Sequence, residues 1–331
     1  MAARAIRPHG LVLCYHRVAE PEADPFDLAV SPRHFAEQME VLRRFGPRLK
    51  FGEFAAQLTS GQAPRRSVCV TFDDGYRDNL HAAVPILAAT GTPATVFVIS
   101  GTVGVERTFW WDSLVDVFLS PGRLPDALEL RVNGTTRRWE LGEAADYSAD
   151  EARAGAGWIV NREAPRDPRQ KTMLEIWSFL CGLTTVEAER LADEIAGWAG
   201  VPRASRREAH PVDLEELRRL SANANVEIGG HTVTHPRLTL LSPDRRLAEM
   251  RDSRIALGEM TGCEITSFAY PFGDHCAETA LLAGEAGYQA ACNTWGRTAL
   301  PDDDPMRIPR IIVGDWDGDR FAHKMRNYTM F

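Results

Sequence analysis

"VCVTFDDGYRDN", residues 68–79, is an apolar run that ends in two adjacent carboxylates, Asp73 and Asp74. The run, which closes with Phe72, has the length and the β-branched content of a buried strand. Like charges held side by side at a strand end repel each other. This cost predicts that the two acids have different tasks, one binding a cation and the other acting beside it as a base. The alternative is that either acid serves as a helix N-cap.

Around this stretch, short apolar runs alternate with amphipathic segments. The apolar runs that predict strands are residues 10–16, 67–74, 93–100, 225–231, 267–273, 288–294 and 307–316. The segments that predict helices are residues 31–46, 79–91, 242–262 and 278–287. Strand, helix and strand recur about every 30 residues, which is typical of a parallel sheet with crossover helices. Runs that are apolar on both faces suit a barrel or a doubly wound sheet.

Residues 105–212 interrupt this rhythm. Asn133 and Gly134, flanked by alternating residues, predict a β-hairpin, and three helical patterns follow it. We therefore expect an inserted hairpin and helical subdomain within a single catalytic domain of residues 1–331. The aromatic stretch that begins at Phe109 allows two interpretations, stacking on sugars at a site mouth or packing in a core.

The bulk composition narrows the class of protein. The chain has 331 residues, of which 44% are hydrophobic and 25% charged, as in an ordinary globular protein. The net charge of -8 without a basic stripe argues against nucleic acid as a partner. No run has the length of a transmembrane segment or a signal peptide core, so we expect a cytoplasmic protein. The 6 scattered cysteines predict reduced, buried thiols.

Several predicted strands end in side chains that can take part in chemistry. His16, the pair Asp73 and Asp74, His231 and Asp315 all stand at or just beyond the end of a strand. In folds built from strand–helix repeats, the carboxyl ends of the strands form the functional face. The coincidence of these residues predicts an active site there.

His231 and His235 lie four residues apart in "GGHTVTHP". Glycines before them and Pro236 after them favour a loop at a strand end over a helix. Two histidines and one carboxylate, with positions left open to water, form a recurrent catalytic metal site. The alternative is a pair of loop histidines that are hydrogen-bonded to the backbone.

"TFDDG", "HTVTH" and "YPFG" together resemble the motifs of the polysaccharide deacetylase family, carbohydrate esterase family 4. The resemblance covers most of the chain outside residues 105–212. It implies an α/β fold, a distorted (β/α) barrel, and metal-dependent hydrolysis of the acetamide of an N-acetylated sugar. An N-acetylated carbohydrate is then the expected partner.

The resemblance also implies roles for individual residues. Asp73 matches the general base, and Asp74, His231 and His235 match the ligands of a divalent metal ion, for which we expect zinc, with cobalt or nickel as alternatives. The backbone N–H of Phe272 would face the oxyanion of the tetrahedral intermediate.

One motif is incomplete. The family has an arginine that braces the base where this chain has Ala269. Arg310 lies on a strand that leads to the same face and is our candidate to replace this arginine. The alternative for Arg310 is a surface ion pair.

The last family motifs supply an acid before a tryptophan and a histidine at a final strand end. Asp315 precedes Trp316 here, but the histidine motif does not follow it. A similar pattern at the start of the chain ends in His16, which suggests a circular permutation. The strand of residues 10–16 would then lie between those of residues 307–316 and 67–74.

In that arrangement His16 would be the general acid, on the side of the metal opposite Asp73, with its ring held by Asp315. The alternative is a hydrogen-bonded histidine in a turn.

We therefore expect a metal-dependent hydrolase that removes an N-acetyl group from a polysaccharide or a glycan precursor. Two other classes stay open, a catalytically weak relative that only binds glycan and a metal-independent hydrolase of cyclic amides on the same barrel. The insertion, residues 105–212, could also form a surface for homo-oligomers.

Overall fold

The structure, a computed structural model, describes residues 10–62, 66–160, 162–204 and 206–329. Contacts within the chain divide it into two compact units. The first contains the described parts of Met1–Glu20, Ala29–Val105 and Val212–Phe331, and the second contains those of Pro21–Leu28 and Glu106–Pro211.

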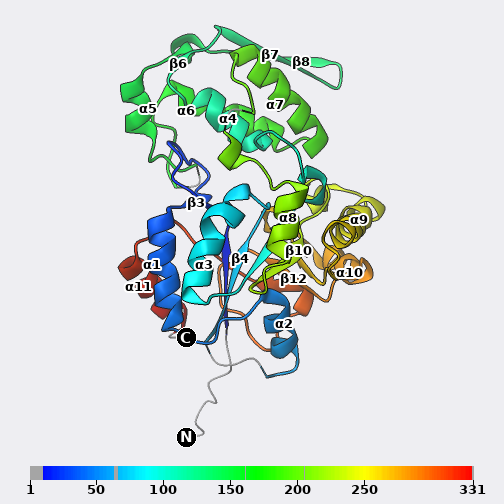
Figure 1. The fold of residues 1–331 in the computed structure, drawn as a ribbon. Helices are drawn as coiled ribbons and strands as arrows, with labels where there is room; N and C mark the ends of the chain where they lie inside the picture. Colours follow the sequence, from blue (N-terminus) through cyan, green and yellow to red (C-terminus); the bar gives the residue numbers. More distant parts are fainter. Residues whose placement is uncertain (1–9, 63–65, 161, 205, 330–331) are drawn as a thin grey trace, which may run out of the picture. The chain divides into compact units, whose positions relative to one another are not determined.

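The first unit is built on an 8-stranded sheet in which all paired strands are parallel (Figure 1). The order of the strands is β13-β12-β11-β10-β5-β4-β1-β14. In chain order they are β1 (Gly10–Tyr15), β4 (Ser67–Phe72), β5 (Ala94–Val98), β10 (Val226–Gly230), β11 (Ser267–Ala269), β12 (Ala290–Asn293), β13 (Ile308–Pro309) and β14 (Ile311–Ile312).

The two strands at the ends of this order are consecutive in the chain. Only Arg310 separates β13 from β14, and the same short segment pairs with β12 on one side and with β1 on the other. The sheet therefore curls into a nearly closed barrel, and the predicted α/β barrel is confirmed.

The placement of the first strand is also as predicted. β1 lies between β14 and β4, with Leu13 opposite Ile311 and Leu11 opposite Val68. A barrel closed in this way has the same neighbours whether or not a strand has been relocated, so the circular permutation stays a prediction.

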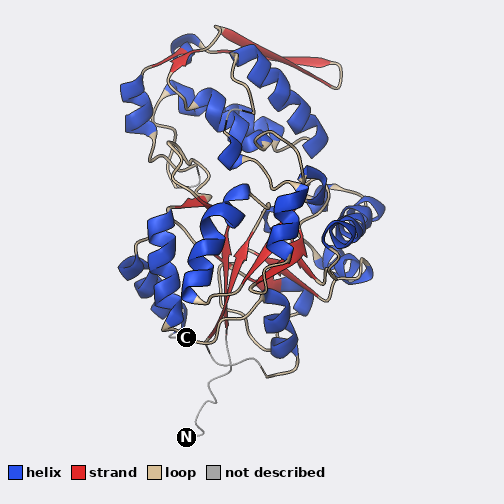
Figure 2. Cartoon of the chain, viewed as in Figure 1, coloured by secondary structure: helices blue, strands red, loops and turns tan. Residues whose placement is uncertain are grey.

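Helices surround the barrel of the first unit (Figure 2). They are α1 (Pro32–Arg43), α2 (Phe51–Thr59), α3 (Val84–Thr90), α8 (Leu214–Ser221), α9 (Pro243–Thr261), α10 (Ala277–Glu285) and α11 (Gly318–Thr329). A short π-helix, Asn79–Ala83, leads into α3, and the short strands β2 (Arg17–Val18) and β3 (Ala29–Val30) pair with each other.

Helix α1 illustrates how local sequence forms these elements. Ser31 accepts a hydrogen bond from the backbone N–H of His34, and a proline follows it at the first helical position. Phe35, Met39 and Leu42 recur at helical spacing and are buried in the core. The helix ends at Arg43, three residues before the end of the predicted segment 31–46.

The alternation of side chains along each strand separates two apolar clusters. Leu11 and Leu13 of β1 belong to the cluster that contains buried residues of the surrounding helices. Val12 of the same strand belongs to a second cluster with Phe54 of α2 and Phe97 of β5. The second cluster therefore fills the barrel interior, and side chains of that face lead toward the strand ends.

The second unit contains helices and two small antiparallel sheets. Its helices are α4 (Trp110–Phe118), α5 (Ala149–Gly155), α6 (Pro168–Leu180) and α7 (Thr185–Ala199). β6 (Gly122–Arg123) pairs with β9 (Asp146–Tyr147), and β7 (Ala127–Val132) pairs with β8 (Thr135–Glu140). None of these strands joins the barrel sheet in the described part of the chain.

The turn between β7 and β8 has the backbone that the sequence predicts. Asn133 and Gly134 adopt φ angles of 48° and 77°, as a two-residue hairpin turn requires. Phe109, Trp110 and Trp111 are at most 6% exposed, so this aromatic stretch packs in a core. Residues 21–28 also belong to this unit, which the sequence did not indicate.

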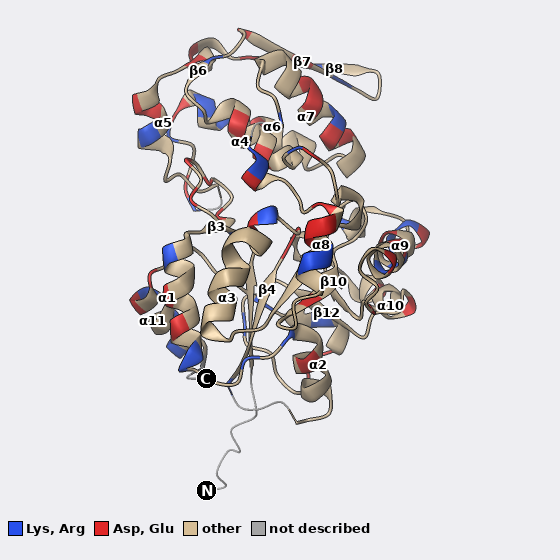
Figure 3. Cartoon of the chain, in the orientation of Figure 1, with Lys and Arg blue, Asp and Glu red and all other residues tan. Residues whose placement is uncertain are grey.

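Charges of both signs are distributed over the helices of each unit (Figure 3). Among the described helices, none is both long enough and apolar enough to cross a bilayer. The cysteines are free; Cys14, Cys69 and Cys292 are buried, whereas Cys263 is exposed, contrary to our expectation.

Candidate active site

The parallel strands bring the predicted residues to one edge of the barrel. His16 follows β1, Asp73 follows β4, His231 follows β10 and Phe272 lies just beyond β11. Arg310 reaches the same edge from the break between β13 and β14. The site is thus built from segments that lie far apart in the sequence.

The chain turns sharply where β4 ends. Asp74 and Gly75 both adopt left-handed backbone, with φ angles of 70° and 76°. This conformation is strained for aspartate and natural for glycine, and a Cβ at Gly75 would also lie 3.1 Å from a methyl group of Val98. The turn sends the side chains of Asp73 and Asp74, both buried, to different partners.

Asp73 is held by a buried guanidinium group. Arg310 donates from Nη1 to Oδ1 and from Nη2 to Oδ2, each at 2.7 Å, and its side chain is 0% exposed. The arginine also donates to Thr71 Oγ1 and to the carbonyl of Asn293. Arg310 therefore contacts the carboxylate that the missing family arginine would brace, and the alternative of a surface ion pair is wrong.

The charge of Arg310 controls the protonation of Asp73. Burial alone raises the pKa of this carboxyl, but Arg310 and the nearby histidines outweigh burial. The pKa of Asp73 therefore lies well below its ordinary value. Asp73 is ionised at neutral pH and can accept a proton.

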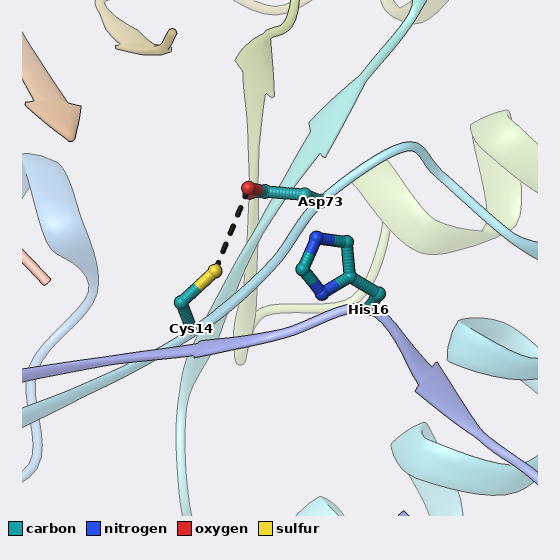
Figure 4. A group of neighbouring side chains, drawn as sticks. All are labelled: Cys14, His16 and Asp73. Carbon is teal, nitrogen blue, oxygen red and sulfur yellow. Dashed lines mark hydrogen bonds between the residues drawn. The ribbon is translucent and has the colours of Figure 1, made fainter. Parts of the chain in front are cut away.

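His16 lies beside Asp73, as Figure 4 shows. A ring nitrogen of His16, the sulfur of Cys14 and a carboxylate oxygen of Asp73 lie within 4.8 Å of one another. The Cys14 thiol also donates to Asp73 Oδ2 at 3.5 Å. We expected His16 on the side of the metal site opposite Asp73; the ring lies close to Asp73, and the side from which it would approach a cation stays a prediction.

Asp74, His231 and His235 converge as predicted. Asp74 Oδ1 lies 3.5 Å from His231 Nε2 and 3.4 Å from His235 Nε2. This oxygen is buried and has no hydrogen-bond partner within the described residues. A buried carboxylate oxygen that faces two imidazoles fits a cation held by all three groups.

Neighbouring groups orient both imidazoles. His231 Nδ1 is 2.7 Å from the carbonyl oxygen of Ala269, and donation to this carbonyl leaves Nε2 free to bind a metal. Thr232 Oγ1 accepts from the backbone N–H of His235. Glu249 of α9 accepts from the backbone N–H groups of residues 233 and 234, which fixes the loop between the two histidines.

Burial affects the two imidazoles differently. Burial lowers the pKa of His235 to about 3, although Asp74 opposes the shift. Burial also acts on His231, but Asp73 and Asp74 outweigh it and raise the pKa of this ring. His235 is therefore neutral at pH 7, the form in which imidazole binds metals.

Phe272 forms one border of the site. Its backbone is left-handed, with φ 58°, and its side chain is 42% exposed. The centres of the Phe272 and His235 rings are 4.7 Å apart, and the guanidinium of Arg237 lies 4.5 Å from the centre of the Phe272 ring. The role of the Phe272 N–H at the oxyanion stays a prediction.

The prediction that Asp315 holds the ring of His16 is wrong. Asp315 Oδ1 accepts from the backbone N–H and the hydroxyl of Ser31, both at 2.9 Å, and lies 2.7 Å from His34 Nδ1. The chain beyond β14 passes the start of α1, whose free N–H groups and positive dipole end attract a carboxylate. Asp315 therefore stabilises the start of a helix.

The sequence reasoning missed several groups that shape the site. Cys14 precedes His16 by two residues, so strand alternation could have indicated that both face the same side. The carbonyl of Ala269 and the carboxylate of Glu249 carry no signal in the sequence. Only the fold brings them to the histidines.

Comparison with known proteins identifies the family. The family model described as polysaccharide deacetylase matches residues 60–128 and 183–291, which together form more than half of the chain. The chain belongs to the polysaccharide deacetylase family. Both motif regions, around Asp73 and around His231, lie within the matched residues.

Two curated members of the family match parts of the chain. The YxkH protein of Bacillus subtilis (strain 168) is 30% identical over 141 residues, 41% of this chain and 48% of the relative. The poly-beta-1,6-N-acetyl-D-glucosamine N-deacetylase of Staphylococcus aureus (strain MSSA476) is 36% identical over 80 residues, 24% of this chain and 28% of the relative. The chain thus matches half or less of the length of these relatives.

Solved structures of deacetylases have the same fold. The Streptococcus pyogenes deacetylase PplD in complex with acetate has a TM-score of 0.59 at 18% identity, covering 96% of this chain and 99% of that one. IcaB from Ammonifex degensii has a TM-score of 0.56 at 19% identity, with 97% of each chain covered. At these identities, the similarity shows a shared fold and nothing about activity.

Proposed function

We propose that this chain hydrolyses the N-acetyl group of an N-acetylated sugar in a polysaccharide or glycan precursor. Family membership supports this reaction. The observation that carries it is the division of tasks between two consecutive acids, since Asp73 pairs with Arg310 and Asp74 faces His231 and His235. This is the division that one base and one metal ligand require.

Asp74, His231 and His235 would hold a divalent cation, with zinc as our first choice and cobalt or nickel as alternatives. A bound cation supplies Lewis-acid chemistry at the acetamide carbonyl. The unsatisfied oxygen of Asp74 supports this assignment, because the protein provides it with no hydrogen-bond donor among the described residues.

Asp73 would accept the proton of the attacking water. Its ionised form is favoured by Arg310, and the two-point contact with this guanidinium fixes the plane of the carboxylate. Oδ1 keeps a second lone pair for the water, whereas Oδ2 also accepts from the Cys14 thiol. Arg310 thus orients the base without occupying all of its acceptor capacity.

His16 would donate a proton to the leaving amine. One of its ring nitrogens lies within 4.8 Å of the Asp73 carboxylate, so acid and base border the same small volume. The backbone N–H of Phe272 would stabilise the negative oxygen that forms during attack.

Acetate release from β-1,6-linked N-acetylglucosamine oligomers is the first assay, given the substrate in the name of the staphylococcal relative. We expect turnover by the purified chain, its loss on dialysis against a chelator, and its recovery with zinc. Equal turnover before and after removal of the metal would contradict the proposal and favour a metal-independent hydrolase. Glycan binding without acetate release in the metal-loaded protein would favour a binding relative.

A further inference from the structure

The structure raises the question of what holds His16 in place. Asp315 does not, and within the described residues no hydrogen bond joins the His16 ring to another side chain. The residue lies between β1 and β2, where the chain leaves the barrel. Its position must therefore depend on its backbone.

That backbone is bound by the turn that follows Asp73. Asn79 Nδ2 donates to the carbonyl oxygen of His16 at 2.8 Å. On the preceding residue, the carbonyl of Tyr15 accepts from the N–H of Asp73 at 3.0 Å. Both contacts tie the end of β1 to the segment that carries the proposed base.

Asp78 binds the residues on the other side of His16. Its Oδ2 accepts from Arg17 Nε at 2.9 Å, and its Oδ1 accepts from the N–H of Val18 at 3.2 Å. The side-chain amide of Asn79 also donates to Asp78 Oδ1 at 3.2 Å. The Asp78 carboxylate and the Asn79 amide therefore belong to one hydrogen-bond network.

The network is buried throughout. Arg17, Asp78 and Asn79 are 3%, 6% and 1% exposed, and the guanidinium of Arg17 lies 4.9 Å from the centre of the buried Tyr76 ring. Burial outweighs Arg17 and raises the pKa of Asp78. A buried ion pair of this kind is costly to desolvate and contributes little net stability, so geometry is the better reason for its presence.

We propose that Arg17, Asp78 and Asn79, which we call the His16 clamp, are positioning residues for the acid step. The clamp fixes the backbone on both sides of His16 and so sets the place of its ring beside Asp73. This inference rests on the proposed function, in which His16 protonates the leaving amine. It also gives a task to Asp78 and Asn79 at the end of the stretch at residues 68–79.

Substrates with different leaving groups distinguish a positioning role of the clamp from a role in stability alone. An acetamide needs a proton on its departing nitrogen, whereas the nitrophenolate of 4-nitrophenyl acetate leaves without one. Asn79→Ala should slow kcat for the N-acetylated oligomer by about 100-fold, since a displacement of about 1 Å has costs of this size. The ester should lose less than about threefold, with metal content unchanged.

Asn293 provides a matched control. It is also a buried asparagine at a barrel strand end, and its Nδ2 also donates to a backbone carbonyl, that of Arg307, at 2.9 Å. Asn293→Ala should change the amide and ester rates in the same proportion. Asp78→Asn is the second clamp variant, and it should reproduce the amide-selective loss if Asn79→Ala folds poorly.

A double-mutant cycle completes the test. In a His16→Ala background, Asn79→Ala should cause no further amide-selective loss, because the clamped side chain is already absent. Equal losses on both substrates in the clamp variants, or full additivity with His16→Ala, would overturn the inference. Failure of the wild-type chain to release acetate would instead contradict the proposed function.

Discussion

Strand β10 connects two carboxylate environments at opposite ends of the barrel. Near its start, Glu227 accepts hydrogen bonds from the hydroxyls of Thr95 and Ser267 and from the N–H of Gly52. Beyond its end, His231 faces Asp74, whose Oδ1 has no hydrogen bond in the described part of the chain. The same strand thus borders a satisfied carboxylate and an unsatisfied one.

The two environments distinguish a structural acid from a functional one. Neutral donors reach both oxygens of Glu227, so each has at least one hydrogen bond from within the chain. A buried carboxylate oxygen that accepts no hydrogen bond within the described residues, such as Asp74 Oδ1 beside the two imidazoles, is costly unless a cation binds it. Asp73 is intermediate between Glu227 and Asp74, because its positive partner is a side chain of the same protein, the guanidinium of Arg310.

Asp74→Asn should have the largest effect, because it removes the charged ligand at the unsatisfied end. We expect zinc content to fall below detection and acetate release to fall about 1,000-fold or more, as loss of several kcal/mol of Lewis-acid stabilisation implies. Metal analysis and the acetate assay on one preparation check this. If the variant kept zinc and activity, Asp74 would be no more functional than Glu227, and the proposed difference between the two carboxylates would be wrong.

Asp73→Asn should remove turnover and keep the metal. Asparagine preserves the shape of the side chain but cannot accept the proton of the water, so kcat should fall about 10²–10⁴-fold. Zinc content serves as the control, whereas the melting temperature should fall, because the substitution leaves the Arg310 charge buried without its partner. Loss of zinc together with activity would make Asp73 a ligand.

Arg310→Met should mainly reduce stability, because it leaves the Asp73 carboxylate buried without its partner. Breaking a buried pair on one side costs about 3–5 kcal/mol, measurable by urea unfolding. Arg43→Met is the control, since its pair with Glu40 is exposed and should contribute at most about 1 kcal/mol. A similar small cost for both variants would mean that Asp73 does not depend on Arg310.

Glu227→Gln should have the smallest effect. It alters a hydrogen-bonded group at the end of the barrel away from the site, so stability should fall by about 1–3 kcal/mol. Zinc content and kcat should stay within about twofold of the unchanged chain, given the separation of the two carboxylates. A large loss of zinc binding would show that the two ends of the barrel are coupled.

Local patterns explain what could be predicted before the structure. Apolar runs and their spacing indicated the barrel strands, and Asn133–Gly134 indicated the hairpin, because both depend on nearby residues only. The same patterns indicated Asp73, Asp74, His231 and His235 as site residues, and the resemblance to a family assigned their roles; the structure gathers them at one edge.

Local patterns in the sequence establish the order of strands and helices, the hairpin, and the acids and histidines at the strand ends. The partner of each polar group depends on the folded chain: Arg310 pairs with Asp73 across 237 residues, and Asp315 binds the start of α1. Periodicity and turn chemistry act over a few residues, whereas charge pairing depends on which strands become neighbours and on which way their side chains face. Those choices exist only once the barrel has closed.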